Sequence, residues 1–288
     1  MIEYTQYKKL PEDYIKSKID EFLKEDIPGI DVTTAGTVPA DKATRAYIEA
    51  QQDFVFAGKE IIPAFFDDKF IIRLYYNDGE EIKSGDRICD IEGPAGRILS
   101  VERVILNLLQ RLCAIATKAK ELSKHTNPHG VRLLDTRKTT PGIRLFEKYA
   151  VTCGGGFNHR MDLSSGVLIK DNHIRAAGGV KAALKKVREK AKRLPIEIEV
   201  DNFRQIKEAL DAGVDGFLLD NFSPDDTIKA VKMIRDYPGG VDIFIESSGG
   251  INLTNISDYV SAGINAISTG SVTHSVSSVD MHMEFEDI

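Results

Sequence analysis

The sequence predicts an α/β protein made of two parts. The first part combines a helical pattern with strand-like runs broken by Asn-Asp-Gly, Ser-Gly-Asp and Gly-Pro, which is typical of an α+β domain. From residue 131 onward, short apolar runs alternate with helical patterns at a spacing of about 20 to 30 residues, which indicates βα units and a parallel sheet. The longest helical pattern of the chain lies between the two parts and could bridge them.

The first part is expected to hold two helices with strands between them. Apolar residues such as Ile15, Ile19 and Phe22 recur at helical spacing after Pro11. In chain order we expect a helix over residues 11–25, a turn over 27–34, strands within 43–58 and 69–100, and a helix over 101–125.

The second part is expected to hold six strands separated by helices, several of which end at Gly or Pro. Six such units could form an open sheet or a barrel, and periodicity alone does not choose between them. The strands are expected over 131–135, 166–170, 196–200, 216–220, 242–246 and 265–270, with helices over 181–193, 203–213, 224–238 and 253–263.

The amino-acid composition argues against several classes of function. The 288 residues are 42% apolar and carry a formal net charge of −6 without a basic tail, which argues against general binding of nucleic acid or of membrane surfaces. The apolar runs fall far short of a membrane span, and the charged N-terminus lacks a signal-peptide core. The three widely spaced cysteines suggest reduced thiols in a cytoplasm, and none forms a zinc-type cluster with histidine.

Polar residues or glycines follow every strand of the second part. In parallel α/β barrels and in open parallel sheets, the carboxyl ends of the strands meet at the edge where ligands bind. Six such coincidences favour a ligand site at this edge. The features are Arg137 and Lys138, Lys170 to His173, Glu199, Asp220 and Asn221, Ser247 to Gly250, and Thr269 to Ser271.

The last two strands end in the sequences SSGG and STGS. Barrels commonly bind phosphate with the backbone N–H groups of their last two loops, because glycine lets the backbone approach the oxygens and serine adds a hydroxyl. Ordinary glycine turns are the alternative. Two such loops at consecutive strand ends favour a phosphate site.

Two carboxylates, Glu199 and Asp220, follow neighbouring strands and would face that site. They could bind Mg²⁺ or ribose hydroxyls, since Mg²⁺ usually takes one or two carboxylates together with substrate phosphates. Period two places Glu197, Glu199 and Asp201 on one face, so the pattern does not single out Glu199. A salt bridge at the mouth of the sheet is the alternative.

Cations gather on the same loops of a net-negative protein, which suggests a strongly anionic substrate. They are Arg137, Lys138, His159, Arg160 and Lys170, with Arg103 and Arg144 nearby in sequence. A solvated charged rim would explain Arg144, Lys148 and Lys185 instead. His159 and His173 could each act as a base. We favour substrate binding for His159 and a structural role for His173.

A set of motifs in one order resembles one enzyme family. DTRKTTPG, EKYAV, GGGFNHR, LIKDNHI, LLDNF, ESSGGI and STGSVTHS span residues 135 to 275, and EDIPGIDVTT and VERVILNLLQRLCAIAT extend the similarity toward the N-terminus. Together they resemble quinolinate phosphoribosyltransferase. The resemblance implies an N-terminal α/β sandwich domain over 1–110, on which the tail 276–288 packs back, and a TIM-like α/β barrel with fewer than eight strands over 111–275.

The resemblance also implies roles for individual residues. Lys138 and Lys170 would contact phosphoribosyl pyrophosphate and stabilise negative charge, and Glu199 and Asp220 would bind the ribose hydroxyls and Mg²⁺. It implies a homodimer or larger homo-oligomer, in which Arg103 reaches the partner's site. The substrate-binding residues would be Thr136, Arg137, His159, Arg160 and Arg103, with Ser248, Gly249, Gly250, Thr269, Gly270 and Ser271 around the 5-phosphate.

One departure from the family pattern is Cys113-Ala114, which stands where relatives usually have Ser-Gly. The implied activity converts quinolinate and phosphoribosyl pyrophosphate into nicotinate mononucleotide, CO₂ and pyrophosphate in NAD synthesis. Alternatives are a phosphoribosyltransferase for nicotinate or another related ring, including the molybdenum-transport-associated paralogue, and a non-catalytic binding module on the same scaffold.

Overall fold

A computed structural model of the chain describes residues 2–286. The chain divides into two compact units, and each is built from several segments. The parallel unit comprises residues 1–6, 121–144 and 156–274, and the antiparallel unit comprises residues 7–120, 145–155 and 275–288. Residues 1, 287 and 288, which belong to the domain ranges expected from the sequence, lie outside the described residues. The boundary expected between residues 110 and 111 stays a prediction.

The antiparallel unit is organised around a sheet of four strands in the order β12-β1-β5-β3. Strand β1 is central to its packing, because its alternate residues Ala46, Ile48 and Ala50 are buried. The C-terminal strand pairs antiparallel with β1, from Arg45–Glu286 to Ala50–Met281. The strands are β1 (Ala43–Ala50), β3 (Ile71–Leu74), β5 (Arg87–Pro94) and β12 (Met281–Glu286), beside the two-stranded pair β2 (Phe54–Val55) and β4 (Glu81–Ile82).

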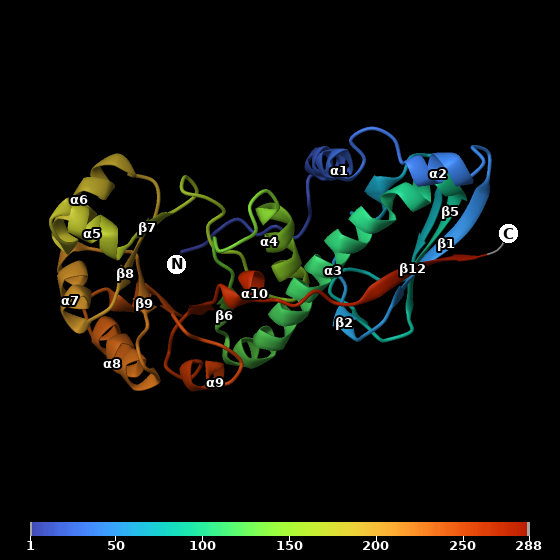
Figure 1. Ribbon diagram of the computed structural model, residues 1–288. Coiled ribbons are helices and arrows are strands. Elements are labelled where there is room, and N and C mark those ends of the chain that lie inside the picture. The colour runs from blue at the N-terminus through green and yellow to red at the C-terminus, as the bar shows by residue number, and fades with distance from the viewer. Residues whose placement is uncertain (1, 287–288) are drawn as a thin grey trace. The chain divides into compact units, whose positions relative to one another are not determined.

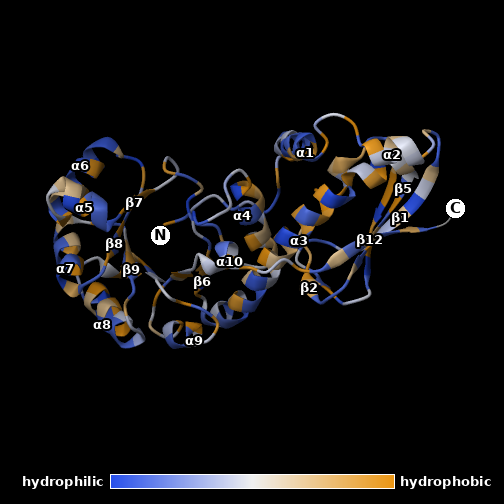
Figure 2. Ribbon diagram, viewed as in Figure 1, coloured by the Kyte–Doolittle hydropathy of each residue, from blue (hydrophilic) through white to orange (hydrophobic). Residues whose placement is uncertain are grey.

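Helix α3 (Ala95–Thr126) is the longest element of the chain, and residues up to Lys120 belong to the antiparallel unit. Figure 2 shows hydrophobic and hydrophilic residues alternating along its turns. This pattern lets one stripe, including Ile98, Ile105 and Leu109, be fully or nearly fully buried. The other helices of the unit are α1 (Glu12–Asp26), α2 (Val32–Thr37), the 3₁₀ turn η1 (Pro63–Phe65) and most of α4 (Arg144–Cys153).

Three local predictions for this unit are wrong. Residues 27–34 are not only a turn, because the Asp31 side chain accepts a hydrogen bond from Thr34 N–H (3.0 Å) and caps α2. Residues 95–100 are helical, because β5 ends at Pro94 and α3 begins directly after it. Lys148 does not lie on a solvated rim but is fully buried in α4.

The parallel unit contains six parallel strands in the order β6-β11-β10-β9-β8-β7. The fold class expected from the sequence is therefore confirmed: an N-terminal α/β part is followed by a parallel α/β part with fewer than eight strands. Within residues 2–286, no strand pairing joins the two edge strands β6 and β7. The strands are β6 (Arg132–Leu134), β7 (Val167–Ile169), β8 (Ile196–Val200), β9 (Gly216–Asp220), β10 (Phe244–Ser248) and β11 (Ala266–Ser268).

Helices cover the outer side of this sheet, and Figure 1 shows α6, α7 and α8 side by side along it. Their apolar faces are buried, as with Ile206, Ala209 and Leu210 of α7. The elements are α5 (Asp171–Ala177), α6 (Val180–Lys190), α7 (Phe203–Ala212), α8 (Pro224–Arg235), α9 (Ile256–Tyr259) and α10 (Ser271–His274), with the 3₁₀ turns η2 (Asn127–His129) and η3 (Gly240–Asp242).

The N-terminal segment, residues 2–6, lies inside the parallel unit. Ile2 belongs to a buried apolar cluster with Leu134, Phe244 and Ala266. A Cβ at Gly216 would lie 2.6 Å from the Ile2 side chain, so glycine at the start of β9 makes room for this segment. The inward face of the sheet is therefore partly filled by residues from the start of the chain.

A helix that spans a membrane must be both long and strongly apolar. Among the residues that the structure describes, none of the helices is both.

Candidate active site

A cavity of about 620 Å³ lies at the carboxyl ends of the parallel strands. Strands β7, β8, β9, β10 and β11 contribute residues to its wall, together with the loops that follow β6, β7, β9 and β10 and the loop between α4 and β7. The cavity is lined by Thr136, Arg137, Lys138, His159, Arg160, Leu168, Lys170, Glu199, Leu218, Asp220, Asn221, Glu246, Ser248, Gly249, Gly250 and Ser268.

One ion pair lies on the β7 and β8 side of the cavity. Lys170 Nζ donates to Glu199 Oε2 at 2.5 Å. The Lys170 backbone N–H donates to His173 Nδ1 (2.9 Å), so the imidazole fixes the start of α5 and thereby the base of the lysine side chain. Burial, and after it the charge of Glu199, raises the pKa of Asp220 on the next strand. The two carboxylates therefore repel each other across the mouth of the sheet.

Two arginines lie close together on the opposite part of the wall. Arg160 is buried, and its Nη1 donates to the Gly166 carbonyl oxygen at 2.9 Å. Burial, and then the charge of Arg137, lowers the pKa of Arg160. Within residues 2–286, the buried Nε of Arg137 has no hydrogen-bond partner. A guanidinium donor that is buried and unsatisfied points to an anion that is bound during function.

The glycine loops lie beside these cations. Ser248 Oγ donates to the Ser268 carbonyl oxygen (3.2 Å), which ties the end of β10 to β11. Gly249 and Gly250 have φ angles of +93° and +64°, a backbone region that favours glycine. In the next loop, the hydroxyls of Thr269 and Ser271 lie 2.8 Å apart.

The structure brings most of the site residues expected from the sequence to this one cavity. Thr269, Gly270 and Ser271 do not line it but directly follow the lining residue Ser268, and a Cβ at Gly270 would lie 2.7 Å from the Lys138 side chain. Arg103 is exposed on α3 in the antiparallel unit and does not line the cavity. Its predicted role in a partner's site stays a prediction.

Sequence reasoning missed the residue that holds the His-Arg loop in place. Asp135 is fully buried, and its carboxylate accepts hydrogen bonds from Asn158 Nδ2 (2.7 Å) and from His159 N–H (2.8 Å). Its position directly after β6, two residues before the cation pair, was a signal that could have identified it. Asp135 thus links two loops of the cavity wall.

A buried acid cluster at the cavity wall was also missed. His159 Nε2 lies 3.4 Å from Glu197 Oε2 and 3.6 Å from Glu246 Oε2. Tyr4, from the N-terminal segment, stacks on the His159 ring with centroids 4.5 Å apart, and its hydroxyl donates to Glu197 Oε2 (3.2 Å). Gly166 makes this possible, because a Cβ there would lie 2.6 Å from the Tyr4 ring.

Burial dominates the electrostatics of this cluster. It raises the pKa of Glu197 to about 7, against the Tyr4 hydrogen bond and the charge of Arg160. Burial, and then the charge of Glu197, raises the pKa of Glu246 to about 7, while His159, the Ser268 hydroxyl and Arg132 oppose that shift. Two adjacent buried carboxyl groups resist ionising together.

Two groups of residues have the chemistry of a cation site. Ligand atoms of His159, Glu197 and Glu246 all lie within 4.8 Å of one another. Glu199 and Asp220 lie on neighbouring strands at the cavity wall, where the mutual repulsion that raises the pKa of Asp220 would be relieved by a divalent cation. The second group fits Mg²⁺ better, because Mg²⁺ prefers one or two carboxylates beside substrate phosphates.

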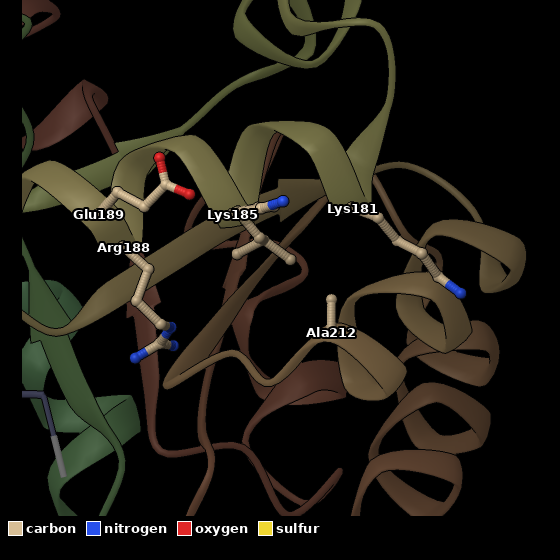
Figure 3. Close-up of a pocket in the computed structure, with 6 residues that line it drawn as sticks. Lys181, Lys185, Arg188, Glu189 and Ala212 are labelled. Carbon is tan, nitrogen blue, oxygen red and sulfur yellow. The ribbon is translucent and has the colours of Figure 1, made fainter.

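A second hollow, drawn in Figure 3, lies on the outer helices α6 and α7. Its wall contains Lys181, Lys185, Arg188 and Glu189 together with Ala212. These charged side chains are exposed, and Arg188 donates to the Gly213 carbonyl oxygen at 2.7 Å. None of the site residues expected from the sequence lies in its wall.

Comparison with known families agrees with this architecture. Residues 115–284 match the family model for the C-terminal domain of quinolinate phosphoribosyl transferase, and residues 31–113 match the model for its N-terminal domain. The chain belongs to the quinolinate phosphoribosyltransferase family. The family resemblance inferred from the sequence motifs is therefore confirmed.

Full-length relatives of this family are similar over nearly the whole chain. A probable nicotinate-nucleotide pyrophosphorylase [carboxylating] from Bacillus subtilis is 39% identical over 274 residues, which cover 94% of this chain and 93% of that protein. A probable nicotinate-nucleotide pyrophosphorylase [carboxylating] from Methanocaldococcus jannaschii is 38% identical over 283 residues, covering 94% and 97%. The solved nicotinate-nucleotide pyrophosphorylase from Francisella tularensis superposes with a TM-score of 0.91 at 34% identity and covers 99% of this chain and 100% of that one.

Proposed function

We propose that the protein transfers the phosphoribosyl group of phosphoribosyl pyrophosphate to quinolinate with loss of CO₂. The products are nicotinate mononucleotide, CO₂ and pyrophosphate, and the reaction belongs to the de novo synthesis of NAD. The observation that carries this proposal is the single cavity in which four cationic side chains, two carboxylates and a glycine loop meet at the strand ends. The cationic side chains are Arg137, Lys138, Arg160 and Lys170.

The cations suit a substrate with two carboxylates. Arg137 and Arg160 lie together, and the buried Nε of Arg137 has no protein partner in the described part of the chain. A bidentate arginine fork satisfies one carboxylate, so two arginines provide for a doubly acidic ring. Nicotinate, with one carboxylate, would leave one of the two guanidinium groups without an anionic partner.

The glycine loops suit the sugar phosphate. Backbone N–H groups around Gly249, Gly250 and Gly270 would bind the 5-phosphate, with hydroxyl groups of Ser248, Thr269 and Ser271 as further donors. The positive φ angles of Gly249 and Gly250 support this role, because glycine adopts this conformation without strain and lets the backbone approach a ligand closely.

The transfer step requires charge stabilisation more than covalent catalysis. The ribose develops oxocarbenium character as pyrophosphate leaves and the pyridine nitrogen attacks C1, as in glycosyl transfer generally. Lys138 and Lys170 would stabilise the negative charge of the leaving group. Glu199, held by Lys170, and Asp220 would orient the ribose hydroxyls.

Mg²⁺ would supply charge neutralisation for pyrophosphate, and Glu199 and Asp220 are the residues that would hold it. Their neighbouring positions at the cavity wall support this assignment. We also propose a homodimer or larger homo-oligomer, in which the exposed Arg103 of one subunit contributes to the partner's site. A cytoplasmic location would fit the three free thiols.

The test is direct. Purified protein is mixed with phosphoribosyl pyrophosphate, Mg²⁺ and quinolinate carrying labelled C2 carboxylate, and release of labelled CO₂ and formation of mononucleotide are followed. We expect both products from quinolinate and none from nicotinate. Consumption of nicotinate but not of quinolinate would overturn the proposal, and binding without turnover would support a non-catalytic module.

A single substitution examines the charge argument. Lys138→Ala should lower kcat/KM by about 10²- to 10³-fold, which is the usual cost of one charge-stabilising group. Lys185→Ala is the matched control, because Lys185 is exposed on α6 outside this cavity. Near-normal turnover by folded Lys138→Ala enzyme would contradict the assigned role.

A further inference from the structure

The overall reaction needs a proton that the transfer step does not provide. When CO₂ leaves C2 of the pyridinium ring, the electron pair of the broken C–C bond stays on C2. The product has a hydrogen at that carbon, so an acid must deliver a proton there before CO₂ returns. Three carboxyl groups line the cavity, those of Glu199, Asp220 and Glu246, and of these Glu246 is the one that is completely buried.

Glu246 reaches the cavity because of its place in β10. Phe244, Glu246 and Ser248 face the same side of the strand, and Phe244 packs inward against Ile2. Glu246 is completely buried, and neither of its carboxylate oxygens has a hydrogen-bond partner of regular geometry within residues 2–286. A buried carboxylate without such partners is costly, whereas the protonated acid is not.

The other members of the cluster are poorer acids. His159 Nδ1 accepts the Arg160 backbone N–H at 2.7 Å, so the imidazole carries its single proton on Nε2. Loss of that proton would leave an imidazolate. Glu197 Oε2 accepts the Tyr4 hydroxyl, which favours its carboxylate form, and Glu197 does not line the cavity. The proton of the cluster therefore belongs on Glu246.

We propose that Glu246 is the general acid that protonates C2 after decarboxylation. The inference rests on the proposed function. The O–H bond of Glu246 breaks, its proton forms the new C2–H bond with the electron pair left by CO₂, and Glu246 becomes a carboxylate. His159 Nε2–H, 3.6 Å away, then stabilises that carboxylate until solvent returns a proton after product release.

The surroundings of Glu246 set the pH at which it can act. Glu197 on β8 is the anion that disfavours a second charge, whereas His159, Arg132 on β6 and the Ser268 hydroxyl on β11 favour ionisation. Burial outweighs the effect of the groups that favour ionisation and holds the pKa of Glu246 near 7. Because the protonated form is the active one, kcat should fall along an alkaline limb at about pH 7 or above it, since bound anionic substrates raise the pKa of Glu246 further.

The experiment compares wild-type enzyme with Glu246→Gln between pH 5.5 and 9, and CO₂ and pyrophosphate are quantified separately in single turnovers. Wild type should show the alkaline limb at about pH 7 or above it. Glu246→Gln keeps the side-chain shape but cannot act as an acid. It should release pyrophosphate at a rate within about threefold of wild type, form mononucleotide about 10²-fold or more slowly, and lack the limb.

Glu197→Gln is the matched control, since it also neutralises a buried glutamate of the same cluster. Removing the charge that raises the pKa of Glu246 should move the limb to lower pH without abolishing it. Circular dichroism and thermal unfolding check that both variants fold. If Glu246→Gln does not fold, the wild-type limb and its shift in Glu197→Gln still decide the question.

Several outcomes would overturn the inference. A wild-type enzyme that turns over but shows no alkaline limb up to pH 9 refutes it while leaving the proposed function intact. A limb that persists in Glu246→Gln assigns the proton to a lysine or to water. One divalent cation per dialysed chain that Glu246→Gln loses would make the cluster a metal site instead. A wild-type protein that releases no CO₂ from quinolinate refutes the function and the inference together.

Discussion

The buried carboxylate of Asp135 offers the sharpest test of how the cavity wall is held. It accepts two hydrogen bonds from the His-Arg loop, one from Asn158 Nδ2 and one from His159 N–H. Asp135→Asn retains one carbonyl oxygen, so it can keep one of these bonds. The new NH₂ group is itself a donor, so it cannot accept the second hydrogen bond and instead faces the N–H group that donated it.

The magnitude follows from these contacts. A hydrogen bond to a charged group contributes about 1.5 to 3 kcal/mol, and a buried donor left unsatisfied costs about 1 to 3 kcal/mol. We therefore expect Asp135→Asn to lower the free energy of unfolding by about 2 to 3 kcal/mol, which lies around the lower limit of the combined range because the loop can relax. For a chain of this size, that corresponds to a fall in Tm of about 4 to 12 °C.

The same change should be visible in substrate binding. Displacing the loop moves His159 and Arg160, so KM for quinolinate should rise by about tenfold or more, since 1.4 kcal/mol is tenfold in an equilibrium constant. Thermal unfolding by circular dichroism and steady-state kinetics with varied quinolinate measure the two effects.

Asp162→Asn is the matched control for this prediction. Asp162 lies in the same connection but is exposed, and it accepts hydrogen bonds from Ser164 N–H and Ser165 N–H. Water can replace those partners, so we expect little change in Tm or in KM. Asp135→Asn and Asp162→Asn enzymes that match each other in both measurements would refute the reasoning.

Two further predictions concern glycine and cysteine. Gly249→Ala should raise KM for phosphoribosyl pyrophosphate far more than Gly250→Ala does. Both glycines have positive φ angles, a conformation that costs alanine about 1 to 2 kcal/mol. Only at Gly249 would the new Cβ also lie 2.2 Å from Asn221 Oδ1. Equal effects in kinetics would contradict this. Burial raises the pKa of the Cys89 and Cys113 thiols to about 12, so both should react with a thiol reagent at pH 8 only after the protein unfolds. Timed labelling followed by mass spectrometry measures this, and rapid labelling of the native protein would contradict it.

The parallel unit was the most predictable part of the fold. Its short apolar runs are buried on both faces and are bounded by turns, so their number and positions could be read from the sequence. The start of α3 could not, because the residues from Ala95 to Ser100 suit a strand or a helix, and the preceding strand decides where the helix begins.

The sequence predicted which residues of the candidate site follow the strand ends. It did not predict how deeply each side chain is buried. Period two correctly places Glu197 and Glu199 on one face, but only the structure shows that Glu197 is fully buried while Glu199 reaches the cavity wall. The contact of Tyr4 with His159 joins residues that are far apart in the sequence. No pattern in the sequence around either residue predicts such a contact.

The mixture of charges around the cavity explains why buried acids lie beside a site that binds anions. Cations such as Arg137 and Lys170 line the cavity, and so does Glu246, although its side chain is fully buried. When a dicarboxylate and a sugar pyrophosphate bind, they add negative charge near Glu246, which disfavours its ionisation further. Substrate binding would thus help Glu246 to keep its proton until C2 needs it, whereas departure of CO₂ and pyrophosphate removes that constraint. An acid placed beside cations alone would lose its proton too early, so the neighbouring carboxylate of Glu197 is part of what makes Glu246 suitable.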